Sequence, residues 1–225
     1  PYDKYKLFIH DYFFIKSIDK LRPGGILAYI SSNGISGGTM DKKDMRARKL
    51  MAERCDFLGA IRLPNNAFLE NAGTGMNTDI IFLQKRDAPR ILGKDLPEWV
   101  ETDTILEHEH TNKDGSKYHN FVAINRYFHN HPEMVLGKLD IVSGPFGPQL
   151  VCNPIPELSQ QLAGAIQNLA PPDRELLEIE SEQVDSEEIE SIPADPSVRN
   201  FSYSLSDGKL YFRENSRMKP VDLGK

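Results

Sequence analysis

The hydrophobic and polar positions of the first 85 residues change period several times. Between Leu7 and Leu21 apolar residues recur at helical spacing, which predicts an amphipathic helix whose inner face holds Phe8, Tyr12, Ile15 and Ile18. Arg22-Pro23-Gly24-Gly25 ends this helix, because proline cannot continue it and glycine tolerates a reversal. The apolar run from Ile26 to Ile30 then predicts a strand covered on both faces, as in a parallel sheet.

The same alternation of helix and strand continues to Leu83. A polar loop over Ser31–Thr39 precedes a helix expected at Met40–Cys55, and strands are expected at Phe57–Leu63 and Ile80–Leu83. A glycine-bearing loop over 64–78 separates these strands. The second helix directs basic residues outward, namely Lys42, Lys43, Arg46, Arg48 and Lys49.

Beyond Asp87 the pattern is weaker. It favours strands at Trp99–Glu109 and Tyr118–Ile124, a short helical or turn segment at Asn125–His131, and a helix at Leu158–Leu169. Asp207-Gly208 lies between two alternating runs and predicts a β-hairpin near the carboxyl terminus. Gly144–Pro148 is expected to be a rigid loop.

Charge divides the chain further. The formal net charge is -6, but acidic residues are concentrated between Pro171 and Pro196, where Arg174 is the only base. Such a block is typical of a solvated, mobile linker. We therefore expect four parts: an α/β part at 1–88, a mixed α+β extension at 89–170, an acidic linker at 171–198, and a hairpin segment at 199–225 that leads to a following module.

Composition narrows the setting. Cys55 and Cys152 have neither metal-ligand spacing nor a disulfide pattern, which favours a reducing, cytoplasmic location. No apolar run reaches the roughly 20 residues of a membrane span, so no membrane partner is expected. The chain begins at Pro1 rather than methionine, and we expect it to be a piece of a longer protein.

Several segments together resemble one family. These are the segments from Tyr2 to Phe13, Pro23 to Asn33, Ile61 to Phe68, Ala72 to Thr74 and Thr78 to Leu83. They are similar to the S-adenosylmethionine-dependent N6-adenine DNA methyltransferases, and to the methylase part of large methylase-helicase fusions of phages and mobile elements. Segments from Tyr127 to Gly137 and the final hairpin also resemble those fusions.

The resemblance implies the carboxyl-terminal half of a Rossmann-like methyltransferase sheet, in a protein that methylates DNA, as restriction-modification enzymes do. The family's Asn/Asp-Pro-Pro-Tyr/Phe motif and glycine-rich cofactor loop are absent here, although Pro1-Tyr2 mimics the motif's last two residues. No catalytic or cofactor-binding residue is therefore assigned. We expect the isolated chain to be inactive and not to bind S-adenosylmethionine. The alternative is a non-catalytic DNA-binding or scaffold module.

Two sets of residues are candidates for contacts with DNA. Ligands of open α/β sheets bind beyond the carboxyl ends of the strands, where Ser32, Asn33, Asn65, Asn66 and Phe68 are expected. The simpler interpretation is that the polar residues make turns and Phe68 packs in the core. Lys42, Lys43, Arg46 and Lys49 are candidates for phosphate contacts, and a solvated helix face is the alternative.

The histidines offer a weaker candidate. His108 and His110 share one side of a predicted strand, and His119 is a third possible ligand, but the set is too small to predict zinc. His129-Asn130-His131 precedes Pro132 and is expected to form a turn. No metal is predicted.

A sheet cut between its halves leaves an edge and an apolar face uncovered. We therefore expect Ile26–Ile30 to be covered by the missing amino-terminal half in the intact protein. In the isolated chain it would be covered by self-association or by the segment from Trp99 to Ile124.

Overall fold

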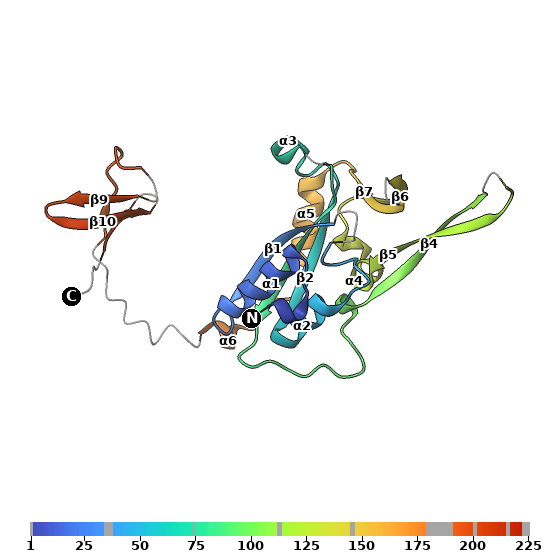
Figure 1. Ribbon diagram of the computed structural model, residues 1–225, viewed down its shortest axis with the longest axis horizontal. Coiled ribbons are helices and arrows are strands. Elements are labelled where there is room, and N and C mark those ends of the chain that lie inside the picture. Colours follow the sequence, from blue (N-terminus) through green and yellow to red (C-terminus); the bar gives the residue numbers. More distant parts are fainter. Residues whose placement is uncertain are drawn as a thin grey trace. The chain divides into compact units, whose positions relative to one another are not determined.

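The computed structural model of this chain describes residues 2–33, 38–73, 75–111, 114–144, 147–178, 191–199, 202–214 and 217–221. The chain forms two compact units, Pro1–Glu178 and Ile179–Lys225 (Figure 1). Each unit has its own sheets, and each is described by itself below.

The first unit is built on a three-stranded sheet of β1 (Ile26–Ser32), β2 (Cys55–Leu63) and β3 (Thr78–Lys85). Its order is β1-β3-β2, and β3 runs antiparallel to both neighbours. The mixed α/β class is confirmed. The expected parallel surroundings of Ile26–Ile30 are wrong for this chain, because β1 is an edge strand whose neighbour, β3, runs antiparallel to it.

Two helices cover one face of this sheet (Figure 1). α1 (Ile9–Lys20) buries Phe14, Ile15 and Ile18, and α2 (Arg46–Arg54) lies beside it. The other face of β1 is open: Ile26 is 43% and Ile30 56% exposed. The prediction of a strand covered on both faces is therefore wrong, since only the α1 side of β1 is packed.

The two outer edges of this sheet differ. Residues next to β2 are paired, because Leu136 donates its backbone N–H to Arg62 O at 2.8 Å and Val135 bridges Arg62. In the described part of the chain no strand pairs with the outer edge of β1. The segment from Trp99 to Ile124 does not cover that edge as expected, because its strands pair with each other instead.

The rest of the first unit consists of short elements. Two hairpins stand out, β4 (Thr102–Thr111) with β5 (Lys117–Asn125), and β6 (Lys138–Gly144) with β7 (Gly147–Asn153). The first confirms the predicted strands, whereas the strands of the second were not predicted. Of the loop expected at Gly144–Pro148, Gly144 ends β6, Gly147 and Pro148 begin β7, and residues 145–146 lie outside the described residues. The helical elements are η1 (Asp3–Tyr5), α3 (Leu69–Ala72), η2 (Glu98–Val100), α4 (Arg126–Asn130), η3 (Pro132–Met134), α5 (Leu158–Gln167) and α6 (Arg174–Glu178).

The second helix is shorter than the sequence predicts. It begins at Arg46 rather than Met40, because Met40 and Asp41 are buried in the turn before it. Arg48 does not point outward as expected; it is fully buried and donates to the carbonyls of Val100, Thr39 and Lys42 at 2.7–2.8 Å. This side chain fastens the turn to α2.

The second unit contains a four-stranded antiparallel sheet in the order β8-β11-β10-β9. β9 (Tyr203–Ser206) and β10 (Lys209–Glu214) form the predicted hairpin, and β8 (Ile192–Pro193) and β11 (Arg217–Pro220) extend it. Asp207 and Gly208 have φ of 49° and 74°, as a two-residue turn with positive φ at both positions requires. The hairpin prediction is confirmed.

The predicted acidic linker spans the junction of the units. Its start is helical in α6, and Ile192–Pro193 belongs to the small sheet. Residues 179–190 lie outside the described residues, and the prediction of mobility there stays a prediction. Within the described parts, no helix combines the length and apolar character that a bilayer crossing needs.

Candidate functional site

The carboxyl ends of β1 and β2 meet at one edge of the central sheet. Ser32 and Leu63 are both in register with Thr78, the first residue of β3. The loops that follow β1 and β2 therefore leave the sheet at the same end. This is where the sequence predicts Ser32, Asn33, Asn65, Asn66 and Phe68.

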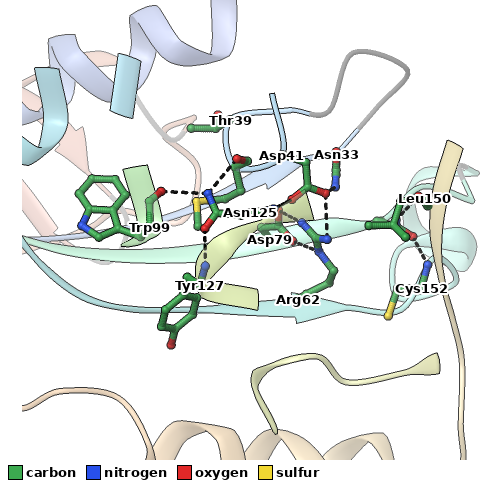
Figure 2. A network of polar contacts seen from close by, with 12 residues as sticks. Asn33, Thr39, Asp41, Arg62, Asp79, Trp99, Asn125, Tyr127, Leu150 and Cys152 are labelled. Atoms are coloured by element: carbon green, nitrogen blue, oxygen red, sulfur yellow. Dashed lines mark hydrogen bonds and ion pairs between the residues drawn. The ribbon is translucent and has the colours of Figure 1, made fainter. Parts of the chain in front are cut away.

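A buried ionic cluster lies just inside this edge (Figure 2). The Arg62 guanidinium donates from Nε and Nη2 to the two carboxylate oxygens of Asp79, at 2.8 and 2.9 Å. Its Nη1 lies 2.9 Å from Oδ2 of Asp41, in an ion pair. The same guanidinium covers the ring of Phe128, 4.3 Å from the ring centroid. The cluster ties β2, β3, α4 and the loop after β1 together.

All three charged residues of this cluster are almost inaccessible to solvent. Burial opposes the charge of Arg62, but Asp41 and Asp79 outweigh it and raise its pKa further above the usual value. The guanidinium is thus permanently charged and neutralised in place. Because it is permanently charged, it does not act as an acid or base, and its role is to hold the loop.

Asn125 extends the network toward α4 (Figure 2). Its backbone N–H donates to Asp41 Oδ1 at 2.8 Å, and its Nδ2 donates to the carbonyls of Met40 and Trp99, both at 2.9 Å. Its Oδ1 accepts the N–H of Tyr127 at 3.0 Å and so caps α4. A fully buried residue whose side-chain amide makes three bonds and whose backbone N–H makes a fourth is a structural joint.

Asn77 fastens β7 to the same edge of the sheet. Its Nδ2 donates to Leu150 O and its Oδ1 accepts the N–H of Cys152, both at 2.8 Å. Asn65 donates its backbone N–H to Cys152 O at 2.8 Å. The side chain of Asn77 thus pairs with β7 as a neighbouring strand would.

A third polar chain runs from α1 to β1. The Thr39 hydroxyl donates to Asp11 Oδ1 at 3.1 Å and lies 3.0 Å from the hydroxyl of Ser31. Burial raises the pKa of Asp11, against the attraction of His10 and the bond from Thr39. Asp11 is therefore a buried carboxyl for which ionisation is costly.

The predicted site residues divide into two groups. Asn33 is used structurally: its N–H donates to Asn77 O at 2.8 Å and its Nδ2 to Asp41 at 2.5 Å. Asn65 is held by β7, Phe68 packs half-buried against the core, and both fit the simpler interpretation. Ser32 and Asn66 are exposed at the edge. The structure brings the two loops together but leaves few of these side chains available to a ligand.

The predicted phosphate contacts differ in accessibility. Lys43 and Arg46 are exposed, and Lys42 and Lys49 are half-buried. Arg46 is engaged by Asp44, to which its Nε donates at 2.9–3.0 Å, and its Nη1 donates to Tyr5 O at 3.2 Å. This contact joins the start of α2 to η1.

The histidines have structural partners where the structure describes them. His129 bonds to Asp103 at 2.8 Å, and His131 lies between Glu98 at 2.9 Å and Glu133 at 3.2 Å. The short helical or turn segment predicted at Asn125–His131 is confirmed as α4, but the turn expected at His129-Asn130-His131 is wrong for His129 and Asn130, which are helical. Side chains of 106–110 and 119–120, and so the predicted histidine pair with His119, lie outside the described residues. Elsewhere in the described residues no group of three or more possible metal ligands occurs.

Sequence reasoning missed the residues that organise this edge: Asp41, Arg62, Asn77, Asp79 and Asn125. One signal was available, since Arg62 follows the apolar run of β2 and Asp79 precedes the apolar run of β3. Opposite charges in neighbouring buried strands imply a buried pair. The asparagines gave no signal, because asparagine is equally typical of turns.

Comparisons with known proteins give one partial similarity. The chain is 35% identical over 77 residues to the Defense against restriction protein B of Escherichia phage P1. The match covers 34% of this chain and 3% of that protein, so the chain corresponds to a very small part of it. No family model matches the chain, and no solved structure matches it.

Proposed function

We propose that this chain is part of a DNA adenine-N6 methyltransferase, in which S-adenosylmethionine supplies the methyl group. The observation that carries the proposal is the open edge of β1, where strands of a further sheet half would add. β1 and β2 run in the same direction and release their loops at one edge. In α/β sheets that edge is where ligands bind.

The missing half of the domain is the first proposed partner. Exposed apolar side chains lie beside the open β1 edge: Ile26 and Ile30, on the uncovered face of the strand, are 43% and 56% exposed. An unpaired strand flanked by such residues is a liability in water. A further strand and its covering helix would bury this surface and complete a Rossmann-like sheet.

In this proposal the chain supplies the frame rather than the reacting groups. The missing half would bind S-adenosylmethionine and carry the catalytic motif. The ionic cluster around Arg62 would hold the loop after β1 rigid at the edge where the target base enters. Ser32 and Asn66 would be available for polar contacts with DNA. Phe68, which packs against the core, would hold the loop after β2 in place.

The name of the phage relative is compatible with this proposal. That protein is named for defence against restriction. Restriction acts on DNA, and methylation of a base is one chemical way to prevent it. We propose DNA as the partner of this activity and the cytoplasm as its setting.

Reconstitution tests the proposed function. The chain would be co-produced with the segment encoded before Pro1, and transfer of a labelled methyl group from S-adenosylmethionine to duplex DNA would be measured. We expect label on adenine N6 from the reconstituted pair and none from either piece. A stable complex of the two pieces that transfers no methyl group would refute the enzymatic role.

A second candidate is a non-catalytic DNA-binding or scaffold module. The exposed basic residues near the start of α2 favour it, because phosphate contacts require no reaction. It predicts that the reconstituted pair binds DNA with strong salt dependence but has no affinity for S-adenosylmethionine. The reconstitution experiment separates the two candidates.

A further inference from the structure

A pocket of about 470 Å³ opens where the amino-terminal segment meets α1. It is lined by Tyr2, Lys6, Leu7, Ile9 and Tyr12. The rings of Tyr2 and Tyr12 meet edge to face, with centroids 5.3 Å apart. This volume lies within the range of small-molecule sites and is large enough for one nucleobase.

Ammonium groups lie over the aromatic rings around this pocket. Lys16 lies over Tyr12, 5.5 Å from its centroid, and Lys4 lies over Tyr5 at 4.8 Å. Lys42, which comes from the segment before α2, lies over the half-exposed ring of Phe8. Two stretches of chain, residues 2–16 and 42–46, thus build one surface of alternating rings and cations.

Lys6 has an unusual backbone. Its φ is 49°, in the left-handed region that costs a residue with a side chain about 1 kcal/mol. Its side chain is exposed and lines the pocket. The strained backbone therefore belongs to Lys6, the cation among the residues that line the pocket.

The surface is basic although the chain is acidic overall. Residues 2–16 and 42–46 contain six lysines or arginines against three aspartates, whereas the whole chain has a formal charge of -6. Asp11 is buried, and Asp44 is paired with Arg46. Asp19 also borders this surface, where it accepts from the Tyr2 hydroxyl at 2.8 Å and pairs with Arg54 at 3.6 Å. Asp3 stands against Lys4, Lys6, Lys16, Lys42 and Lys43, so the net charge of the surface is positive, which complements a polyanion.

We propose that this surface binds single-stranded nucleic acid, with one unpaired base in the pocket against Tyr2 and Tyr12 and the backbone along Lys4, Lys6 and Lys16. Rings that stack on bases beside a basic track are the usual means of holding single strands. An apolar patch without this positive charge would instead favour a protein as the partner. The proposal deepens the proposed function, on which it rests for the class of partner, but it needs neither cofactor nor methyl transfer.

The test measures fluorescence anisotropy of a labelled oligothymidylate with the full chain. We expect Tyr2→Leu to weaken binding about tenfold, and Tyr2→Phe, which keeps the ring, to bind as the unchanged chain does. Lys6→Glu is expected to weaken binding and to reduce the salt dependence by about one counterion. Tyr203→Leu and Lys94→Glu replace an exposed ring and an exposed lysine elsewhere, and should have no effect.

Circular dichroism melts show whether each variant is folded. No binding by the folded, unchanged chain, or equal binding by all variants, would overturn the proposal. If duplex DNA binds as tightly as the single strand, the proposal that the pocket holds an unpaired base is wrong. Concentration-dependent association that Tyr2→Leu abolishes, without oligonucleotide binding, would assign the surface to a protein contact instead. None of these measurements uses S-adenosylmethionine, so their outcome does not depend on the outcome of the reconstitution test.

Discussion

At the scale of single residues, the buried ionic cluster is the most sensitive point of the fold. Replacing Asp79 by alanine leaves the charge of Arg62 buried with one carboxylate, Asp41. We expect a loss of about 3–5 kcal/mol in the free energy of unfolding, measured with urea. The matched control is Asp44→Ala, which removes the half-buried partner of the exposed Arg46 and should cost at most about 1 kcal/mol. Equal losses in the two variants would contradict a structural role for the cluster.

Both thiols are predicted to be unreactive in the folded chain. Burial raises the pKa of Cys55 to about 12 and that of Cys152 to about 11. The thiolate is the reactive form, so near pH 8 very little of it is present. We expect a thiol reagent to label neither cysteine until denaturant is added, as followed by absorbance. Immediate labelling of the native chain would show that this part of the core is open.

Residue identity was only partly predictable from the sequence. The sequence indicated which loops reach the edge of the sheet, because strand ends follow from the apolar runs. It did not indicate that Asn33 is hydrogen-bonded to Asp41 and Asn77, or that Asn65 is hydrogen-bonded to Cys152. Several of these partners come from distant segments of the chain. Arg48 was misplaced for the same reason: its carbonyl partners lie outside its own helix.

At the scale of elements, α4 is held by a histidine between two carboxylates. Burial opposes protonation of His131, but its bonds to Glu98 and Glu133 outweigh burial and raise its pKa. Its contribution to stability is therefore complete below its unfolded pKa of about 6.5 and is lost as pH rises through the folded value. We expect His131→Gln to lower the melting temperature more near pH 6 than near pH 8.5. A pH-independent difference would contradict this role.

Elements with strong local signals were predicted well. The helix around α1, the strands β2 and β3, and the Asp207-Gly208 hairpin follow from periodicity and turn residues. The place of β1 at the edge was not predictable, because an all-apolar run does not show which neighbours it has. The β6–β7 hairpin was missed, since its strands mix polar and apolar residues.

At the scale of the whole molecule, the open β1 edge governs association. We predict that the isolated chain self-associates through this edge, because Ile26 and Ile30 remain exposed beside it. Ile30→Lys adds a charge to that face and should shift the chain to monomer in sedimentation, with little change in stability. The control is Leu205→Lys on the second unit, which should not alter association. A monomeric unchanged chain would contradict the prediction.

The central proposal is that this chain is a frame and that a further half-domain supplies the reacting groups. Its most direct test is calorimetric titration of S-adenosylmethionine into the isolated chain and into the reconstituted pair. We predict no binding to the chain alone and clear binding to the pair. A dissociation constant below about 10 μM for the chain alone, near -7 kcal/mol, would contradict the account, because the cofactor site would then lie within these residues.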